Sequence, residues 1–372
     1  MIYLDNAATT FPKPDCVINT MCDFLRLYGG NPGRGGHYFS RKSAEKIYEC
    51  RELFAKLISA DNPEHIIFTK NATEAINLAI KGSVKRGDEI IISSMEHNSV
   101  LRSCIDLEKE GITVKIARAD SDGYVSENSI IPLISERTRL ICIIHASNVV
   151  GTVNPVKKIC EAARKKGVLT LIDAAQTAGI IEVNSSWADM IAFAGHKALY
   201  GPFGTGALYI SASLKLDTLI EGGTGSMSES ALMPDMLPDR FEAGTLNACG
   251  IAGLSEGIRF VTSEGAGEKE LENGKILMEK LSSVKDVRIV GNPGVGVVGC
   301  VLKNHDCVDI ASRLDSEYSI AVRAGLHCAP MAHRSLGTVT KGMLRFSTGY
   351  FNTEEEITSC VHSLEKILLN TN

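Results

Sequence analysis

The sequence predicts an α/β protein whose mainly parallel β-sheet is covered by helices on both faces. The prediction depends on one repeated pattern. From about Pro63 to Ile210, short apolar runs alternate with segments in which apolar residues recur at helical spacing. Strands that alternate with helices form parallel sheets, because each helix carries the chain back to the edge where the next strand starts.

The predicted strands in this region are residues 65–69, 88–94, 112–117, 138–147, 169–172 and 190–193. The helices predicted between them cover residues 73–87, 99–111 and 155–167. In the first helix Ile76, Ala79, Ile80 and Val84 form one apolar stripe. The third opens near Pro155 and closes at Gly167, since proline favours helix starts and glycine favours helix ends.

The pattern changes in the last third of the chain. Residues 221–245 are rich in Gly, Ser, Met and Pro, which predicts an extended loop. After Gly257 we expect a helix over 268–281, short strands, and a final helix that opens on the capping box Thr353-x-x-Glu356. We therefore expect a large domain over residues 16–258 and a small α+β domain over residues 259–372, with residues 1–15 packing on the small one.

One glycine motif is misleading. Residues 294–299 match the dinucleotide-binding pattern GxGxxG, but an apolar, strand-like run follows them. The dinucleotide fingerprint must open a helix. We read this segment as a glycine-rich turn that leads into a strand.

Composition argues against several classes of protein. The formal net charge is −5 and the charges are not segregated, so we expect no nucleic-acid partner and no membrane partner. Neither a secretory signal nor a membrane-length apolar stretch is visible. The eleven cysteines have neither the spacing of a disulfide framework nor that of a metal finger. We therefore expect free thiols, no bound metal and a cytoplasmic location.

Two neighbouring predicted strands end in polar residues that suit one cofactor. Asp173 and then Gln176 follow the strand at 169–172, and His196 and Lys197 follow the strand at 190–193. In open parallel sheets ligands bind beyond the carboxyl ends of the strands. A carboxylate for a pyridinium nitrogen and an amine for an aldehyde are what pyridoxal 5′-phosphate (PLP) requires. Singly, such an Asp could be a turn residue and such a Lys a surface residue. Together they predict a PLP enzyme.

Two other strand ends carry residues that could contact this cofactor. Asn71, Thr73 and Glu74 stand where a helix begins, and the free N–H groups of a helix N-terminus bind phosphate. Alternatively, Thr73 only caps the helix. His97 follows the strand at 88–94, and as a neutral imidazole it could stack on the cofactor ring and carry protons.

Cys328 is the cysteine most suited to chemistry. It lies in a loop with Arg323, His327, glycine and proline, and positive charge lowers the pKa of a thiol. The local sequence also allows a loop cysteine without a role. The other ten cysteines lie mostly in apolar surroundings and are predicted to be packing residues.

Taken in order along the chain, these motifs resemble the cysteine desulfurases and selenocysteine lyases of the class V aminotransferase superfamily, which have PLP fold type I. The resemblance runs from YLDNAAT (3–9) to RFSTGYFNTEEEI (345–357). It includes NATEAINLAI, MEHNSV, ASNVVGT, LIDAAQ, AGHKALYGPFGTG, FEAGTLN and RAGLHCAP. It implies seven strands in the mainly parallel sheet of the large domain.

The resemblance also implies a role for each candidate residue. Lys197 would bind the PLP aldehyde as a Schiff base, and Asp173 would pair with the pyridinium nitrogen. Gln176 would contact the ring hydroxyl, His97 and Asn148 the ring face, and Thr73 and His196 the phosphate. Thr245 would reach the phosphate of the partner subunit in a homodimer. Arg345 would bind the substrate carboxylate, Asn148 would also contact the substrate, and Cys328 would be the nucleophile.

The implied reaction converts L-cysteine to L-alanine, with Lys197 or His97 as the base that removes the α-proton, and leaves sulfur on Cys328 as a persulfide. An acceptor protein would then take the sulfur for iron–sulfur cluster assembly or thio-modification. Two positions depart from the family pattern, Ala194 in place of a phosphate-binding Ser and Leu326 in place of a common His. The short segment from Cys328 to Arg345 favours the compact-loop, SUF-type branch.

Three other functions fit the same residues. A selenocysteine lyase would share every named residue but would not need Cys328, because selenium leaves readily. An aminotransferase or epimerase of the same fold would not release alanine from cysteine. A non-catalytic scaffold for sulfur carriers would keep the fold without turnover, although the set of Asp173, Lys197, His97 and Arg345 argues against it.

Overall fold

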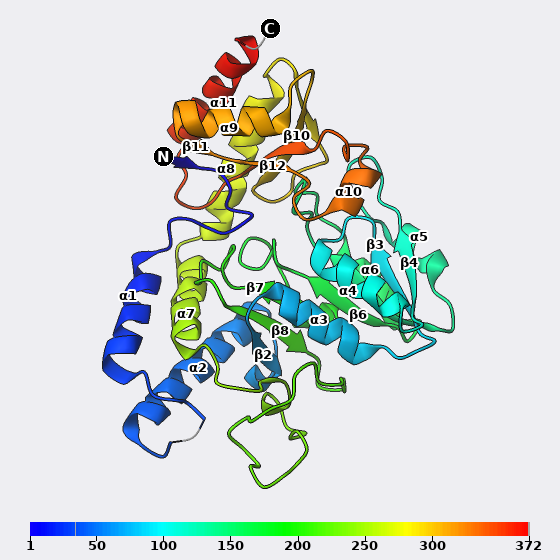
Figure 1. Ribbon diagram of the computed structural model, residues 1–372, viewed down its shortest axis with the longest axis vertical. Coiled ribbons are helices and arrows are strands. Elements are labelled where there is room, and N and C mark those ends of the chain that lie inside the picture. The colour runs from blue at the N-terminus through cyan, green and yellow to red at the C-terminus, as the bar shows by residue number, and fades with distance from the viewer. Residues whose placement is uncertain (34, 371–372) are drawn as a thin grey trace.

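The computed structural model describes residues 1–33 and 35–370. Its largest sheet has seven strands in the order β2-β8-β7-β6-β5-β3-β4 (Figure 1). The strands are β2 (Ile66–Thr69), β3 (Glu89–Ser93), β4 (Thr113–Ala117), β5 (Thr138–Ile144), β6 (Leu169–Asp173), β7 (Met190–Ala194) and β8 (Gly206–Ile210). β3 to β7 pair in parallel, and β8 runs antiparallel to both neighbours. The predicted seven-stranded, mainly parallel sheet is confirmed.

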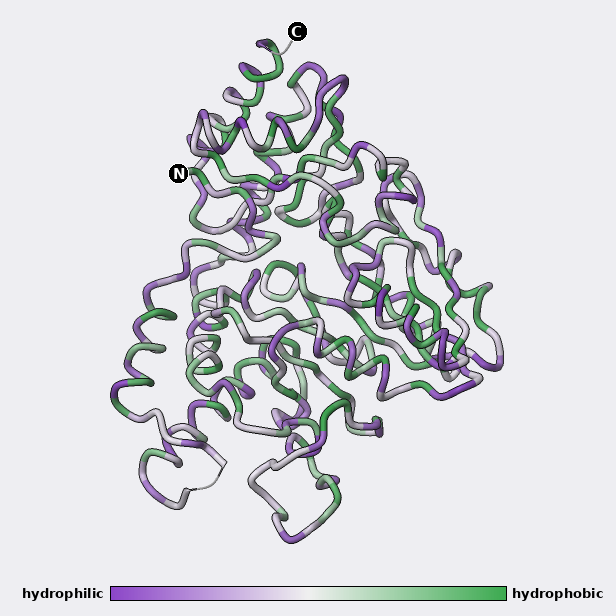
Figure 2. Tube along the Cα trace, viewed as in Figure 1, coloured by the Kyte–Doolittle hydropathy of each residue, from purple (hydrophilic) through white to green (hydrophobic). Residues whose placement is uncertain are grey.

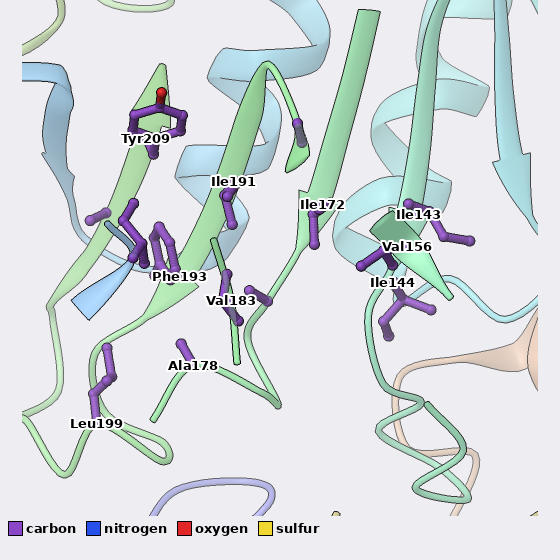
Figure 3. Close-up of a cluster of buried hydrophobic side chains, with 14 of the residues drawn as sticks. Ile143, Ile144, Val156, Ile172, Ala178, Val183, Ile191, Phe193, Leu199 and Tyr209 are labelled. Carbon is purple, nitrogen blue, oxygen red and sulfur yellow. The ribbon is translucent and has the colours of Figure 1, made fainter. Parts of the chain in front are cut away.

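Helices cover both faces of this sheet. α3 (Ala72–Ser83) and α4 (Asn98–Glu108) share one core with strand residues such as Met190 and Ala192. α2 (Tyr38–Leu57), α6 (Val156–Arg164) and α7 (Ala248–Ser263) share a second core with Ile191 and Phe193, which Figure 3 shows beside Ile172 of the next strand. Because successive strand residues point to opposite faces, both sides of the inner strands are buried, whereas the edge strand β4 is partly exposed. This burial explains why the inner strands are mostly apolar; Figure 2 colours the chain by hydropathy in the view of Figure 1.

Two helices precede the region for which the sequence predicted elements. α1 covers Asp15–Asp23 and continues into a π-helical turn at Phe24–Tyr28, and α2 has 20 residues. The prediction began at Pro63 and missed both. The predicted helices at 73–87, 99–111 and 155–167 are confirmed as α3, α4 and α6. Pro155 is the N-cap of α6 and not its first helical residue.

The C-terminal part has a separate antiparallel sheet in the order β12-β13-β10-β9. Its elements are α8 (Ala266–Ser282), β9 (Val287–Val290), β10 (Val297–Leu302), α9 (Cys307–Tyr318), β12 (Arg323–Gly325), α10 (Pro330–Ser335), β13 (Met343–Ser347) and α11 (Glu354–Leu369). Apolar residues of α8, α9, α11 and the sheet form a core of their own. Gly299 lies in β10, so the GxGxxG segment does lead into a strand, and the capping box of α11 is confirmed. The predicted domain boundary falls inside α7 and stays a prediction.

The N-terminal residues join the two sheets. β1 (Ile2–Tyr3) pairs in parallel with β11 (Ile320–Ala321), beside the C-terminal sheet (Figure 1). A few residues later, the backbone N–H of Thr10 donates to the carbonyl of His196, which follows β7 of the large sheet. The segment between them therefore crosses the space where the two sheets face each other.

The remaining regular segments are short. α5 covers Glu127–Ile130, and residues 221–245 contain no strand and only a 3₁₀ turn at Asp239–Phe241, as the loop prediction requires. Within residues 1–33 and 35–370, no helix has both the length and the apolar character needed to cross a bilayer.

Candidate active site

A cavity of about 220 Å³ lies at the carboxyl ends of β5, β6 and β7, where residues of the C-terminal sheet close over the large sheet. Nine of the predicted site residues line it: Thr73, His97, Asn148, Asp173, Gln176, His196, Lys197, Cys328 and Arg345. These residues come from one strand of each sheet, from α3 and from five loops. The structure therefore places them together, and their individual roles stay predictions.

Two predicted residues do not line this cavity. Glu74 accepts a hydrogen bond from the backbone N–H of Lys70 at 2.6 Å, so its carboxylate is directed back along the loop before α3. Thr245 lines a different cavity of about 390 Å³, where Asn31 Nδ2 donates to its hydroxyl at 3.4 Å. Within one chain, Thr245 cannot contact a ligand held at Lys197.

The environments of Asp173 and Lys197 suit their predicted roles. Asp173 ends β6, and one carboxylate oxygen accepts from the backbone N–H of Ala175 at 2.9 Å. Burial raises the pKa of Asp173, while that N–H group and Lys197 act in the opposite direction. Burial lowers the pKa of Lys197 to about 8, partly opposed by Asp173. A substantial fraction of the Lys197 amine is therefore neutral, and thus nucleophilic, near neutral pH.

His97 is held as a neutral imidazole. It is the N-cap of α4, and its Nδ1 accepts from the backbone N–H of Ser99 at 3.1 Å. Burial lowers the pKa of His97 to about 4, helped by the nearby charges of Lys197 and Arg323. Since Nδ1 is an acceptor, the single ring proton is on Nε2.

The N-terminus of α3 reaches the cavity through Asn71 to Thr73. Asn71 is the N-cap, and its side chain accepts from the backbone N–H of Glu74 at 2.9 Å, so the alternative that Thr73 caps the helix is wrong. The first N–H groups of a helix have no partner within it and favour an anion. A Cβ atom at Gly206 would lie 2.6 Å from the backbone carbon of Asn71, so only glycine lets β8 approach this helix end so closely.

The Cys328 loop has an uncommon backbone. His327 and Cys328 both have positive φ angles, 49° and 55°. Asn148 Nδ2 donates to the carbonyl of His327 at 2.7 Å, and the backbone N–H of Asn98 donates to the carbonyl of Cys328 at 2.8 Å. These bonds stabilise a conformation that non-glycine residues rarely adopt.

Cys328 is exposed, and all eleven cysteines are free. Cys16 and Cys22 on α1 are exposed as well, so the packing role expected for most other cysteines does not extend to these two. Within the described ranges, no group of three or more His, Cys, Asp or Glu residues is arranged to hold a metal ion.

Arg345 is almost fully buried, with 2% of its surface exposed. Its Nη2 donates to Asp5 at 2.6 Å and its Nη1 donates to the carbonyl of Asn148 at 2.9 Å. Three buried polar atoms of cavity-lining residues have no partner within residues 1–33 and 35–370: Arg345 Nε, Asn148 Oδ1 and His196 Nδ1. Because buried polar groups are usually hydrogen-bonded, these atoms indicate a polar ligand.

Sequence reasoning missed several residues of this site. Ala7 and Ala8 line the cavity, and the carbonyl of Ala7 accepts from Gln176 Nε2 at 3.0 Å. Small apolar residues carry no chemical signal that could have identified them. Lys13 was also missed. It contacts the cavity-lining residue His196, to whose carbonyl its Nζ donates at 2.8 Å.

The class-V aminotransferase model matches residues 2–359. The chain belongs to the class-V aminotransferase family. It is 37% identical to a probable cysteine desulfurase from Methanothermobacter thermautotrophicus, over 98% of this chain and 94% of the relative. It is 34% identical to a cysteine desulfurase from Salmonella agona, over 99% and 93% of the two chains.

The chain is also similar to solved structures of cysteine desulfurases. An apo cysteine desulfurase from Thermococcus onnurineus NA1 superposes on this chain with a TM-score of 0.91 at 32% identity, covering 99% and 95% of the two chains. A cysteine desulfurase from Escherichia coli gives 0.89 at 26% identity, covering 99% and 94%. The predicted fold class and the resemblance to cysteine desulfurases are confirmed.

Proposed function

We propose that this protein is a PLP-dependent cysteine desulfurase that converts L-cysteine to L-alanine and receives the sulfur on Cys328. The observation that carries the proposal is the single cavity that joins Lys197 and Asp173 to Cys328 and Arg345. A PLP enzyme needs the first two, and sulfur transfer from an amino acid needs the other two. The relatives named cysteine desulfurase support this function over the alternatives.

The cavity residues fit PLP. Lys197 supplies a partly neutral amine, Asp173 a buried carboxylate, and the N-terminus of α3 with His196 an anion site. Ala194 lines the cavity without a side-chain hydroxyl, so the phosphate would have one hydrogen bond fewer than a serine there would give. When bound, PLP would supply an aldehyde for the substrate amine and a ring that withdraws electrons from the Cα atom.

The protein residues have distinct tasks in this reaction. Arg345 would bind the substrate carboxylate, for which its unpartnered Nε–H remains available. Lys197 is the better acceptor for the α-proton, because its pKa of about 8 exceeds the pKa of His97, about 4. His97 would instead stack on the ring as a neutral imidazole.

Cys328 would take the sulfur as a thiolate. Its attack on the substrate sulfur forms an S–S bond and breaks the Cβ–S bond, whose electron pair stays with carbon and is protonated. The sum is L-cysteine plus enzyme thiol giving L-alanine plus enzyme persulfide, with no external oxidant. The persulfide would then pass to an acceptor protein.

We also infer a homodimer. Thr245 lies in a cavity separate from Lys197, as expected if it serves the partner's phosphate. A PLP-loaded, active monomer in sedimentation experiments would contradict this inference. The free cysteines favour a cytoplasmic location.

The test is alanine release from L-cysteine, with a thiol reductant present, by the wild type and by Cys328→Ala. Alanine from the wild type alone supports a desulfurase that uses Cys328. Little alanine from either protein would contradict the proposal. L-Selenocysteine is the comparison substrate, since a selenocysteine lyase would release alanine from it even without Cys328.

A further inference from the structure

A second hollow, of about 530 Å³, begins at Cys328 and lies between α3 and α4. We call it the α3–α4 groove, and it is lined by Asn77, Lys81, Arg102, Ser103, Asp106 and Cys328 among others. The two helices lie side by side on one face of the large sheet (Figure 1). Cys328, Thr73, His97 and Ser99 line both the groove and the catalytic cavity, so the two hollows are continuous.

Cys328 is held at the junction of the two hollows. The backbone N–H of Asn98, the first residue of α4, donates to its carbonyl at 2.8 Å. Asn148 holds the preceding carbonyl at 2.7 Å. A backbone fixed on both sides cannot carry the sulfur away, so an acceptor must reach the thiol where it is. The catalytic cavity admits the amino acid, and the groove gives a separate approach.

The groove carries one uncompensated positive charge. The Arg102 side chain is exposed, and its guanidinium makes no hydrogen bond or ion pair with any residue in the described ranges. The other cation, Lys81, lies 3.8 Å from Asp106, which Lys109 also contacts at 2.9 Å. The N-termini of α3 and α4 both lie at the Cys328 end, and their dipoles add to the positive potential there.

The groove also offers polar contacts away from Cys328. The hydroxyl of Ser103 is buried and has no hydrogen-bond partner within residues 1–33 and 35–370. A buried hydroxyl of this kind is usually paired, so its free state indicates that something polar binds beside it. From Thr73 to Lys81 the α3 wall is about 12 Å long, at about 1.5 Å per residue.

We propose that the α3–α4 groove binds an acidic, cysteine-bearing segment of the sulfur-acceptor protein and places that cysteine at Cys328. This inference rests on the proposed function. A free small thiol would need only the Cys328 end, whereas the length of the groove, Arg102 and Ser103 suit a peptide with carboxylates beside its cysteine. The acceptor thiolate attacks the outer sulfur of the Cys328 persulfide, the S–S bond breaks, and Cys328 leaves as a thiolate that takes up the acceptor's proton. No oxidant or reductant is consumed.

The probes are two synthetic peptides, one with aspartates around a single cysteine and one with lysines. Each is activated as a mixed disulfide with thionitrobenzoate. Cys328 attacks the peptide sulfur and releases coloured thionitrobenzoate, so the readout needs no desulfurase turnover. We would compare wild type, Arg102→Glu and Arg288→Glu, a matched charge reversal at an exposed arginine of β9. Cys328→Ala gives the background from Cys16 and Cys22.

We expect the wild type to react faster with the aspartate peptide than with the lysine peptide. Arg102→Glu should lower this rate ratio about 3- to 10-fold at low salt, and Arg288→Glu should leave it unchanged. The preference should weaken as salt screens the charges. Equal rates with both peptides in the wild type, or equal losses in both variants, would overturn the proposal. So would a small thionitrobenzoate disulfide that reacts as fast as the aspartate peptide.

The alanine assay reports separately on the proposed function. Alanine release without peptide selectivity would contradict only the groove proposal. Peptide selectivity without alanine release would contradict the proposed function and leave a charge-selective surface at Cys328.

Discussion

The ion pair between Asp5 and Arg345 offers a quantitative test of how the two ends of the chain stabilise the fold. Arg345 is 2% exposed and Asp5 20%, and Nη2 lies 2.6 Å from Oδ1. We expect Asp5→Asn to lower the free energy of unfolding and Asp5→Ala to lower it further. In both variants the buried guanidinium loses the charge that compensates it.

The magnitude follows from the partners that remain. A hydrogen bond to a charged group contributes about 1.5–3 kcal/mol and a neutral one about 1 kcal/mol, so Asp5→Asn should cost about 0.5–2 kcal/mol. Removing one partner of a fully buried pair costs about 3–5 kcal/mol, and the partial exposure of Asp5 lets water replace some of it. We therefore expect about 3 kcal/mol for Asp5→Ala.

The assay is equilibrium urea unfolding at pH 7.5 with Asp23→Asn as the control. Asp23 is an exposed residue at the end of α1, and its neutralisation should change stability by less than about 0.5 kcal/mol. If Asp5→Asn also stays within about 0.5 kcal/mol of wild type, the ion pair does not compensate the Arg345 charge and the reasoning is refuted.

Three other predictions concern single residues. Glu242→Ala should lower the free energy of unfolding by about 3–5 kcal/mol, because Arg51 is 4% exposed and loses its ion-pair partner. Urea unfolding measures the loss, and a loss no larger than that of Glu242→Gln would contradict this prediction. Gly206→Ala should weaken PLP binding and lower the free energy of unfolding by about 1–3 kcal/mol, because the new Cβ meets the backbone of Asn71. An unchanged PLP affinity in titration and an unchanged free energy of unfolding would show that the N-terminus of α3 is free to move. The reaction of the apo-protein with PLP should speed up as pH rises through about 8, since deprotonation of Lys197 yields the nucleophile. In Asp173→Asn this rise in rate should shift to lower pH, because the carboxylate that raises the pKa of Lys197 is gone. Stopped-flow absorbance measures the rate, and a rise centred near pH 10.5 would mean that burial does not lower the pKa of Lys197.

The parts of the fold that could be predicted are those that depend on residues close together in the sequence. Strands buried on both faces read as short apolar runs; Asp173 ends one of them, and Lys197 lies three residues after the next one. The carboxyl ends of adjacent parallel strands meet at one edge, so chain order alone brought these residues together. This is why most of the candidate site could be named before the structure.

The parts that could not be predicted depend on contacts distant in sequence. Ala7 lines the cavity only because the N-terminal segment crosses to the large sheet. The choice of Asn71 over Thr73 as helix cap depends on backbone geometry, since both residue types cap helices well. In α2, charged residues interrupt the apolar stripe that contains Ile47 and Phe54, and burial against the sheet decides the outcome.

The route of the N-terminal segment also bears on the order of events during synthesis. Asp5 binds Arg345 across 340 residues, and Thr9 and Thr10 bind the carbonyl of His196. During synthesis Lys197 therefore leaves the ribosome long before Arg345 of β13, which completes the lining of the same cavity. If Arg345 binds the substrate carboxylate as proposed, a chain that ends before β13 should lack substrate binding even though Lys197 and Asp173 are already present.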